Sequence, residues 1–249
     1  MTRVLKIGGS ILTDKNRDAA ARPEEIRRVA EEIASLPDDL VLVHGAGSFG
    51  HIPAKRYCLP ESFSPEGLLL THKSVVRLND LLVEALSRAG ASPMPVHPLS
   101  CTLLKDGRIE AFAVGPVKEM VRDGLLPVLH GDVAMDVSRK AGIVSGDQLV
   151  PCLARSLGAE VVAVGTDVDG VLLSGSPLVE MTRADMPSLA DAVGGSLGVD
   201  VTGGMKGKLL ELLDLADDGI GSVIFNASKE GNISRALQGE PLGTRVKSA

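Results

Sequence analysis

Aromatic residues are scarce in this 249-residue chain, which contains four Phe, one Tyr and no Trp. Its core must therefore be aliphatic, and base stacking, the usual means of holding single-stranded nucleic acid, is largely excluded. Basic runs are also missing, since no more than two Lys or Arg residues adjoin and the formal net charge is −6. An acidic surface without a basic patch repels phosphate backbones and anionic membranes. We therefore expect neither a nucleic-acid partner nor a membrane partner.

Cysteine is equally sparse, because Cys58, Cys101 and Cys152 lie far apart and form no CxxC pair. Such a pattern indicates free thiols in a reducing compartment rather than a disulfide framework. The first residues lack the segments of a signal peptide, and no apolar run approaches the ~20 residues that span a bilayer. The expected location is therefore cytoplasmic. No cluster of histidine and cysteine has metal-ligand spacing, so no resident metal is expected.

What the chain does contain is an alternation of strands and helices almost from end to end. The predicted strands are apolar on both faces, which indicates a mostly parallel sheet covered by helices on both sides. Predicted strands cover residues 3–7, 40–44, 94–96, 125–130, 161–164, 223–225 and 244–246, with hairpins within 103–111 and 133–144. Predicted helices cover residues 23–36, 48 onward, 70–89, 117–123, 148–157, 205–216 and 233–237. Segments 58–66 and 174–198, rich in proline or glycine, are predicted to be irregular.

Glycine and polar residues follow most of the predicted strands. They occur in Lys6-Ile-Gly-Gly-Ser10, His44-Gly-Ala-Gly-Ser-Phe-Gly-His51, His130-Gly-Asp132, Gly165-Thr-Asp-Val-Asp-Gly170 and Asn226-Ala-Ser228. Ligands of open parallel sheets bind beyond the carboxyl ends of the strands. The repeated pattern therefore predicts a ligand site at that edge of the sheet.

The second of these segments matches the dinucleotide fingerprint G-x-G-x-x-G over Gly45–Gly50. Dinucleotide binding also requires an acidic residue about 20 residues on, at the end of the next strand. Only Glu66 is near, and nothing places it in a strand. The motif therefore keeps its general meaning, which is an anion held by backbone N–H groups at a helix N-terminus. A Walker-type phosphate loop is absent, so nucleotide binding would have to occur without one.

Three lysines indicate an anionic ligand. Lys6 alternates with Leu5 and Ile7 in an apolar strand, where a lysine is costly unless an anion meets it. Lys206 and Lys208 begin a helix, where cations oppose the helix dipole. Solvated lysines in turns remain the simpler interpretation of each position taken singly.

Acidic residues leave alternatives open. Asp147 follows Ser145-Gly146 at the start of a helix, which is a complete structural explanation by itself. Asp167 and Asp169 either cap the following turn or contact a ribose or Mg²⁺.

The five histidines divide into three groups. His72 and His97 have no supporting context and are interpreted as structural. His44 and His130 end strands before glycine and are expected to order the loops. His51 differs, because it follows the glycine-rich turn in the predicted first turn of a helix, where an anion would sit.

Taken together and in order, the segments K-x-G-G-S, H-G-A-G-S-F-G-H, S-G-D, T-D-V-D-G and D-V-T-G-G-M-x-x-K resemble the amino acid kinase superfamily. The second histidine of H-G-A-G-S-F-G-H is similar to that of the archaeal-type isopentenyl phosphate kinases. The resemblance runs over nearly the whole chain. It implies a single α/β domain over residues 1–249, a three-layer α/β/α sandwich that pairs into a homodimer. The acceptor half would span about residues 1–157 and the nucleotide half about 158–249.

The activity implied by the resemblance is phosphoryl transfer from ATP, carried with Mg²⁺, to isopentenyl phosphate. The product, isopentenyl diphosphate, belongs to a variant mevalonate route to isoprenoids. The implied catalytic residues are Lys6, Lys15, His51, Asp147 and Lys208. The lysines would neutralise the transferring group, Asp147 would organise them, and His51 would bind the acceptor phosphate. No general base is needed, because a phosphate monoester with a second pKa of about 6 is already ionised near neutral pH.

The remaining implied contacts are mostly glycines. Toward the nucleotide they are Gly8, Gly9, Ser10, Gly47, Asp167, Gly170 and Gly204, with Lys6 and Lys208. Toward the acceptor they are Gly45, Ala46, Gly50 and Gly146, beside His51. The apolar tail of the acceptor is expected against the long helix, at Val75, Val76 and Leu82.

Two other functions stay open. A superfamily member with the same ATP site could phosphorylate a phosphonate antibiotic, a nucleoside monophosphate or glutamate. A nucleotide-binding regulatory module without catalysis is disfavoured, because Lys6, Lys15 and Lys208 are all present. The choice of acceptor rests mainly on His51.

Overall fold

A computed structural model of the chain describes residues 2–36, 39–173, 176–187 and 204–248. Within these ranges the main sheet has eight strands in the order β12-β14-β13-β9-β1-β2-β6-β3. Its strands are β1 (Arg3–Ile7), β2 (Leu40–His44), β3 (Pro93–Val96), β6 (Leu126–His130), β9 (Val161–Thr166), β12 (Glu180–Met181), β13 (Ser222–Asn226) and β14 (Thr244–Val246). All pairs from β13 to β3 are parallel, and only β14 pairs antiparallel with β13.

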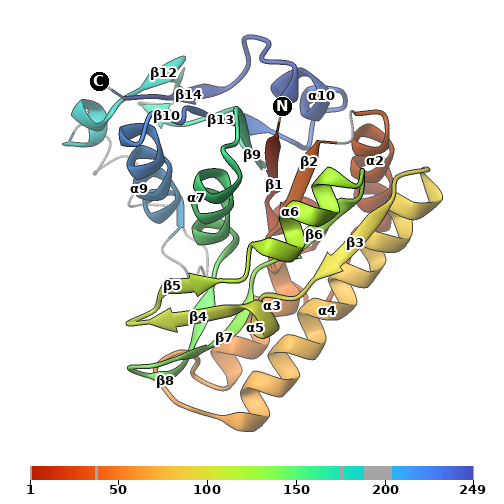
Figure 1. The fold of residues 1–249 in the computed structure, drawn as a ribbon, viewed down its shortest axis with the longest axis vertical. Helices are drawn as coiled ribbons and strands as arrows, with labels where there is room; N and C mark the ends of the chain where they lie inside the picture. The colour runs from red at the N-terminus through yellow and green to blue at the C-terminus, as the bar shows by residue number, and fades with distance from the viewer. Residues whose placement is uncertain (1, 37–38, 174–175, 188–203, 249) are drawn as a thin grey trace.

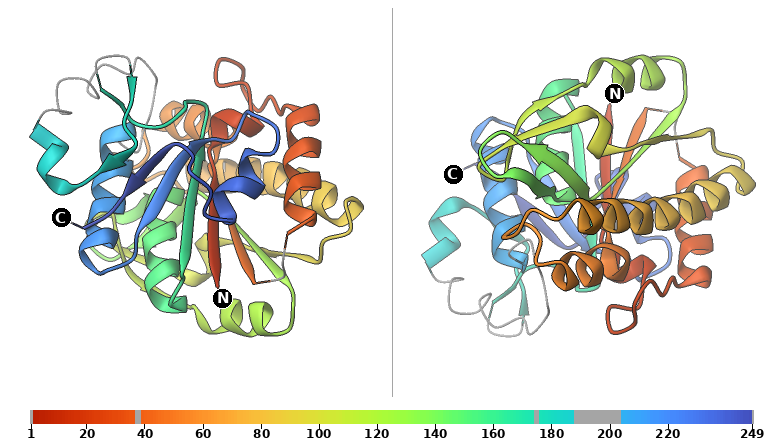
Figure 2. Two further views of the ribbon diagram at one scale, coloured as in Figure 1. Left: turned by 90° about the horizontal axis from the view of Figure 1, so that it is seen from above. Right: turned by 90° about the horizontal axis from the view of Figure 1, so that it is seen from below.

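Helices cover both faces of this sheet, as the alternating side chains of its strands require. One apolar cluster joins Leu5 and Ile7 to the first layer, and another joins Val4 and Val43 to the second. The first layer contains α1 (Gly9–Leu12), α2 (Pro23–Ala34), α3 (Gly47–Arg56), α4 (Pro65–Arg88) and α10 (Asn232–Leu237). The second contains α6 (Gly115–Arg122), α7 (Gly146–Leu157) and α9 (Gly204–Asp217). The predicted three-layer α/β/α sandwich is therefore confirmed (Figure 2).

A second sheet, with strand order β5-β4-β7-β8, lies beyond the carboxyl ends of the main strands (Figure 1). It consists of the two predicted hairpins, β4 (Thr102–Lys105) with β5 (Arg108–Phe112) and β7 (Asp132–Asp136) with β8 (Lys140–Val144). The Asp136 carboxylate accepts N–H groups from Gly107 at 2.7 Å and Ser138 at 2.8 Å, and so joins the two hairpins. Smaller elements are α5 (Pro98–Cys101), β10 (Leu172–Leu173), β11 (Ser176–Pro177) and η1 (Arg183–Asp185).

Several predicted boundaries were wrong. Helix α4 begins at Pro65 rather than Leu70, because the Ser64 side chain accepts the Gly67 N–H at 3.0 Å and proline suits the first helical position. Helix α3 begins at Gly47, so His51 starts the second turn rather than lying in the first. Much of the predicted irregular stretch 174–198 lies outside the described residues. No helix in the described ranges is long and apolar enough to cross a membrane.

The topology places the ends of three strands together at the centre of the sheet. The chain passes from β1 to its neighbour β2 on one side and later returns as β9 on the other. Backbone hydrogen bonds join the strand ends, from Gly45 N to Ile7 O and from Gly8 N to Gly165 O, each at 2.9 Å. Such a switch point is where open α/β sheets bind ligands.

Candidate active site

Two glycine loops lie in backbone contact at this switch point. A Cβ atom on Gly9 would lie 2.4 Å from Gly47 N, and one on Gly45 would lie 2.5 Å from Gly9 N. Gly47 also has a left-handed φ of +51°, which disfavours other residues. The Thr13 hydroxyl joins the loops, since it donates to Gly9 O at 2.8 Å and accepts from Ser48 N at 3.1 Å. Only glycine permits this approach, and Thr13 is a site residue that sequence reasoning did not select.

A buried cluster of two lysines and one carboxylate lies beside the loops. Lys6 Nζ is 2.8 Å from Asp147 Oδ1, and Lys208 Nζ is 3.0 Å from the same oxygen. The three residues come from β1, α7 and α9, whose positions are 141 and 61 residues apart in sequence. Gly146 makes room for this arrangement, because a Cβ there would lie 2.9 Å from Lys6 Cε. The structure thus brings together three of the five predicted catalytic residues.

Burial and mutual contact control the charges of this cluster. Burial lowers the pKa of Lys6 to about 8, although the nearby Asp147 partly offsets it. Burial alone would raise the pKa of Asp147, but Lys208 and Lys6 outweigh that effect and hold the pKa well below its usual range. Two cations therefore meet at one carboxylate, where a bound phosphate would offer further charged acceptors.

His51 and Lys15 follow the two glycine loops in the chain. His51 is half-buried on α3, one turn after Gly47. Helix geometry leaves the first N–H groups of α3 without partners inside the helix, so anions are favoured at this end. Lys15 is exposed in the excursion between α1 and α2, two residues beyond Thr13, whose strand bridge with Ala21 closes the excursion. No described contact joins Lys15 to the buried lysine cluster.

Residues predicted for the nucleotide follow β9 and β13. Asp167 is exposed in the turn after β9. Asp169 accepts from Asn226 Nδ2 at 2.9 Å and pairs with Lys229 Nζ at 2.6 Å, and these contacts lower its pKa. Gly170 has a φ of +142°, and a Cβ on it would lie 2.5 Å from the Thr244 hydroxyl. Asn226 belongs to a strand-end segment that the sequence indicated, whereas Lys229 is a site candidate that only the three-dimensional contact reveals.

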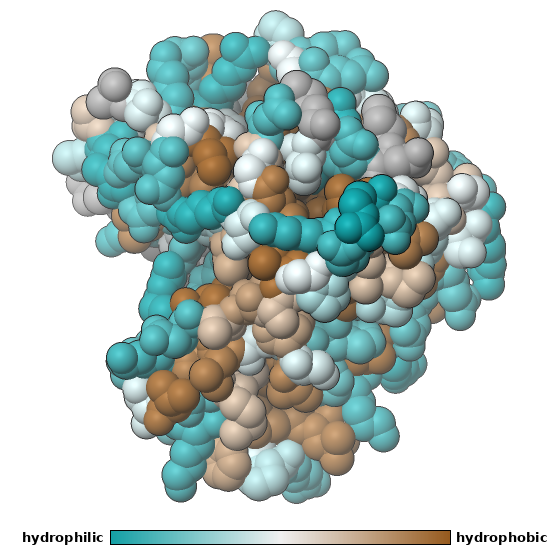
Figure 3. Space-filling model, viewed as in Figure 1, coloured by the Kyte–Doolittle hydropathy of each residue, from teal (hydrophilic) through white to brown (hydrophobic). Residues whose placement is uncertain are grey.

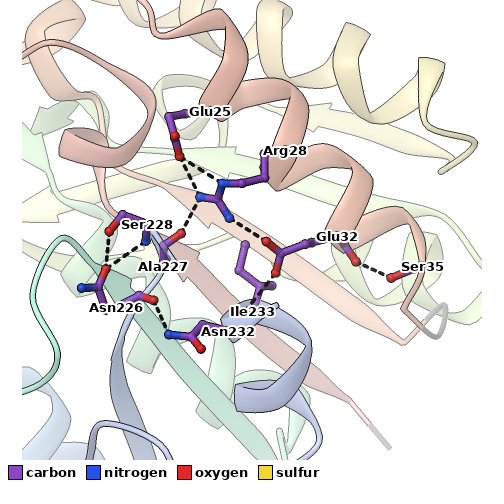
Figure 4. A network of polar contacts seen from close by, with 9 residues as sticks. All are labelled: Glu25, Arg28, Glu32, Ser35, Asn226, Ala227, Ser228, Asn232 and Ile233. Atoms are coloured by element: carbon purple, nitrogen blue, oxygen red, sulfur yellow. Dashed lines mark hydrogen bonds and ion pairs between the residues drawn. The ribbon is translucent and has the colours of Figure 1, made fainter. Parts of the chain in front are cut away.

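Helix α2 holds the loop after β13 through a network of polar contacts (Figure 4). Arg28 lies between Glu25 and Glu32 and donates to the carbonyl of Ala227 at 2.6 Å. Glu32 also accepts the N–H of Ile233 in α10 at 3.2 Å. Helix α2 therefore supports the loop that follows Asn226 at the end of β13.

The histidines interpreted as structural belong to a cluster. His72 Nδ1 lies 3.0 Å from Asp132 Oδ2, and His97 Nδ1 lies 2.9 Å from His130 Nε2. His44 and His130 are paired in register on β2 and β6 and are fully buried. Their partners are distant in sequence, so no local pattern revealed the cluster.

The remaining implied contacts also lie at this edge. Gly8 and Ser10 flank the start of α1, and Gly204 is the first residue of α9, with a left-handed φ of +61°. Gly50 packs against Ala46, since a Cβ on Gly50 would lie 2.4 Å from Ala46 Cβ. In the described residues no group of three or more His, Cys, Asp or Glu side chains could hold a metal ion.

Of the three residues expected to line the apolar tail, Val75 and Leu82 lie in the core and Val76 is half-buried. Val75 and Leu82 are fully buried in the core between α4 and the sheet. A separate small apolar cluster of Ala54, Leu59 and Val133 lies between α3, the following loop and β7. Ala54 lies three residues after His51, on the same side of α3. The small cluster therefore adjoins the His51 end of the site.

Comparison with known proteins gives consistent results. A family model described as amino acid kinase family matches residues 1–226. Isopentenyl phosphate kinases of Methanocaldococcus jannaschii and Methanothermobacter thermautotrophicus are 34% and 37% identical, and each alignment covers 98% or more of both chains. A crystal structure titled as isopentenyl phosphate kinase superposes with a TM-score of 0.86 at 33% identity, covering 99% of this chain and 100% of that one.

Proposed function

The chain belongs to the amino acid kinase family, and we propose that it transfers the γ-phosphoryl group of ATP to isopentenyl phosphate. The observation that carries the proposal is the convergence of Lys6, Asp147 and Lys208 on two stacked glycine loops beside the helix of His51. The full-length similarity to isopentenyl phosphate kinases supports the choice of acceptor. The product would be isopentenyl diphosphate, an isoprenoid precursor.

The reaction is mainly an electrostatic problem. An oxygen of the acceptor phosphate forms a bond to the γ-phosphorus, and the bond from that phosphorus to the bridging oxygen breaks, so ADP leaves with the electron pair. The nucleophilic oxygen is already ionised, and no proton must be removed. Catalysis then depends on alignment and on neutralising charge between two anions. Lys6 and Lys208 supply positive charge on one side of the transferring phosphoryl group. We assign Lys15, in the exposed loop after α1, to the other side.

The nucleotide and acceptor are proposed to bind on opposite sides of the stacked loops. Gly8–Ser10, Asp167, Gly170 and Gly204 would contact ATP, and the turn carrying Lys229 adjoins that group. Gly45, Ala46, Gly50 and Gly146 would contact the acceptor with His51. This division corresponds to the acceptor half, about residues 1–157, and the nucleotide half, about 158–249.

Magnesium is proposed to arrive with ATP. Among the described residues the carboxylate nearest the loops, Asp147, is already paired with two lysines, and no acidic cluster forms a cage. Mg²⁺ commonly binds through substrate phosphates and water with few protein ligands. The residues present thus do not fit a resident ion, and no step is assigned to one.

The apolar tail of the acceptor is assigned to the small cluster around Ala54, Leu59 and Val133 rather than to Leu82. A five-carbon chain gains about 0.8 kcal/mol for each CH₂ group removed from water. That gain would distinguish isopentenyl phosphate from glutamate or a nucleoside monophosphate. Beyond the site, the proposal includes a homodimer and a reducing cytoplasmic location, consistent with the three free cysteines.

A coupled assay of ADP release tests the function. The purified chain would be supplied with ATP and, separately, isopentenyl phosphate, UMP, glutamate or a phosphonate. We expect kcat/KM for isopentenyl phosphate to exceed the others by at least a hundredfold. Preference for another acceptor would overturn the substrate while leaving the family intact. Absence of ADP release with every acceptor, together with measurable ATP binding, would favour a regulatory module.

A further inference from the structure

Four of the five histidines meet beneath the acceptor loops, although they come from four separate segments. The ring centroids of His44 and His130 are 5.6 Å apart, those of His130 and His97 5.2 Å, and those of His97 and His72 5.9 Å. His44 and His130 are inaccessible to solvent. Buried imidazoles in a row need defined proton positions, because a ring nitrogen that carries hydrogen must face an acceptor and one that does not must face a donor.

The hydrogen bonds fix the protons on the two buried rings. Nδ1 of His44 faces the carbonyl oxygen of Gly45, and Nδ1 of His130 faces that of Gly131, each at 3.1 Å. A carbonyl oxygen can only accept, so both Nδ1 atoms must carry hydrogen. The state of each ring then depends on what its Nε2 atom meets.

Both Nε2 atoms can meet donors. His97 Nδ1 lies 2.9 Å from His130 Nε2 and can donate its hydrogen to it. His44 Nε2 faces the amide of Asn79, whose Nδ2 is buried without a partner when Oδ1 faces the ring. Exchanging the positions of the two amide atoms lets Nδ2 donate to His44. The alternative is a buried imidazolium facing neutral groups, which is costly.

The charged groups around the row support neutral rings at its centre. Asp132 is the carboxylate closest to His130, at 4.0 Å, but it already accepts from His72 Nδ1, Leu99 N and Val133 N. Burial lowers the pKa of both His44 and His130, and neighbouring imidazoles lower that of His130 further. The hydrogen bond to Asp132 raises the pKa of His72. Protonation is therefore more favourable at His72, at the outer end of the row, than at its buried centre.

The consequence lies in the peptides that the rings hold. The carbonyl and N–H of a trans peptide point in opposite directions. The hydrogen bond from His44 Nδ1 to the Gly45 carbonyl therefore points the N–H of Ala46 away from His44. The hydrogen bond from His130 Nδ1 to the Gly131 carbonyl likewise points the N–H of Asp132 away from His130. A Cβ on Gly131 would lie 3.5 Å from Ala46 N and 3.6 Å from Gly146 N. The two peptides thus converge where the glycine loops meet.

We propose that His44 and His130 are positioning residues, which orient the Gly45–Ala46 and Gly131–Asp132 peptides for the acceptor phosphate. Asn79 and His97 donate to their Nε2 atoms, so both rings are neutral and carry hydrogen on Nδ1. The statement rests on the proposed function for the identity of the acceptor. Neither ring touches the reacting atoms. Their role is to aim the backbone donors of Ala46 and Asp132.

Spectroscopy tests the proton positions without any activity. The chain contains five histidines, so ¹⁵N labelling of histidine alone gives five imidazole systems that single variants can assign. We expect His44 and His130 to remain neutral with hydrogen on Nδ1 from pH 6 to pH 8. Hydrogen on Nε2 of either ring, or an imidazolium, would overturn the proposal whatever the acceptor proves to be.

Kinetics tests the consequence. His97→Phe keeps a ring but removes the donor to His130, whereas His97→Asn places an amide N–H near the former Nδ1. We expect His97→Phe to raise the acceptor KM about three- to tenfold, the effect of one hydrogen bond, with the ATP KM unchanged. His97→Asn should restore the wild-type acceptor KM. Equal rises in both KM values, or an unchanged acceptor KM in His97→Phe, would show a purely structural row and overturn the proposal.

A matched variant addresses the other ring. Asn79→Leu removes the donor to His44 Nε2, and we expect the same selective rise in acceptor KM, with hydrogen retained on His44 Nδ1 by the Gly45 carbonyl. If the substrate panel identified another acceptor, the same comparison would be made with that compound. Failure of the proposed function and failure of the positioning role are therefore separate results.

Discussion

Lys6 illustrates how one buried charge links sequence to chemistry. Its apolar neighbours Leu5 and Ile7 predicted an unusual lysine, and the structure places it against Asp147 in a nearly dry position. Burial lowers its pKa to about 8, so the free enzyme loses this cation in mildly alkaline solution. A bound triphosphate favours the charged form and would raise the pKa again.

The pH profile of ATP use should report this lysine. We expect kcat/KM for ATP to fall above about pH 8, and kcat at saturating ATP to fall only at higher pH. Lys6→Arg should show lower activity but no fall near pH 8, because a guanidinium stays charged. A fall at the same pH in Lys6→Arg would assign it to another group.

Asp147 should stabilise the fold as well as order the site. Asp147→Asn removes the carboxylate that Lys6 and Lys208 share, and we expect the free energy of unfolding at pH 7 to fall by about 3–5 kcal/mol. The folded-state pKa of Asp147 is depressed, so its stabilisation is present above pH 4 and lost as the pH falls below it. The difference from wild type should also shrink above about pH 8, where Lys6 loses its charge.

Urea denaturation of both proteins from pH 3 to pH 10 measures this difference. Asp14→Asn, a substitution in the exposed excursion after α1, is the control and should cost less than about 0.5 kcal/mol. A pH-independent difference between wild type and Asp147→Asn would contradict the ion-pair explanation.

The proposed choice of acceptor depends on His51. His51→Ala should raise the KM for isopentenyl phosphate, with a loss of about 1.5–3 kcal/mol in transition-state binding, or ten- to a hundredfold in kcat/KM. His51→Gln should retain part of the activity, because its amide can still donate one hydrogen bond. ATP affinity, measured by calorimetry, should not change. Wild-type kinetics in His51→Ala would remove the main residue-level support for a phosphate acceptor.

The limits of sequence reasoning are clearest for paired residues. Lys6 was identified from its immediate neighbours, and His51 from the loop before it. Asp147 had a sufficient local explanation at a helix start, so its two lysine partners were not visible from the residues around it. His72 and His97 had no local signal, because their partners Asp132 and His130 lie 60 and 33 residues away. Contacts of this kind are set by the topology of the sheet.

Among the secondary-structure elements, helices with strong end signals were predicted best. Pro23 begins α2, and Ser145 caps α7 by accepting the Gln148 N–H at 3.2 Å. The four-residue helices α1 and α5 were missed, because one turn is too short to show a 3.6-residue period. Helix α1 is held by Thr13, whose hydroxyl donates to Gly9 O in α1 and accepts from Ser48 N beside the other glycine loop. Tertiary contact, rather than local propensity, forms it.

Helix α2 should support the nucleotide site through Arg28. Its side chain bridges Glu25, Glu32 and the carbonyl of Ala227, next to the residue that binds Asp169 (Figure 4). Arg28→Lys keeps the charge but loses the planar fork. We expect a loss of about 1.5–3 kcal/mol in stability and a severalfold rise in the KM for ATP, with the acceptor KM unchanged.

The neighbouring arginine provides the control. Arg27 pairs only with Glu24 on the exposed side of the same helix, so Arg27→Lys should change stability by less than about 1 kcal/mol. Thermal unfolding and initial-rate kinetics of the two variants make the comparison. Equal effects of the two substitutions would show that the helix, and not the bridge, is responsible.

For the molecule as a whole, the layer architecture was predicted from the apolar strands, but the strand order was not. The pattern of strands covered on both faces requires helices above and below the sheet. It does not say that β9 adds beside β1 on the side opposite β2, which creates the switch point. Nor does it show the small sheet folding beyond the strand ends, where it carries Asp132 to the histidine row.

Two exposed apolar surfaces could join the proposed homodimer. The small sheet exposes Leu103, Met135 and Val137, on a face with apolar side chains in Figure 3. Helix α4 and edge strand β3 expose Leu81 and Met94, and the two elements pack together. Strand β3 is an edge strand of the main sheet, so a second copy of the chain could pack there against both the sheet and the helices that cover it.

The edge of β3 determines how such a partner could bind. Ser92 O accepts from Leu126 N, so the backbone N–H and C=O groups of Met94 and Val96 point toward β6. The backbone groups of Pro93 and Pro95 point outward, toward the open edge of the sheet. Prolines offer no N–H group there, which prevents a full ladder of hydrogen bonds to another strand. We therefore predict a dimer joined by the side chains of Leu81 and Met94 rather than by one continuous sheet.

Charge substitution on each surface distinguishes the alternatives. Leu81→Glu and Met94→Glu bring carboxylates into a contact between two copies, where unpaired charges are costly, and each should convert the dimer to a monomer. Val137→Glu is the matched control on the small sheet and should leave the dimer intact. Light scattering after gel filtration measures the mass of each variant, and the wild-type dimer should weigh about twice the 25.9 kDa chain. Dissociation by Val137→Glu alone would place the interface on the small sheet, and a monomeric wild type would remove the homodimer from the proposal.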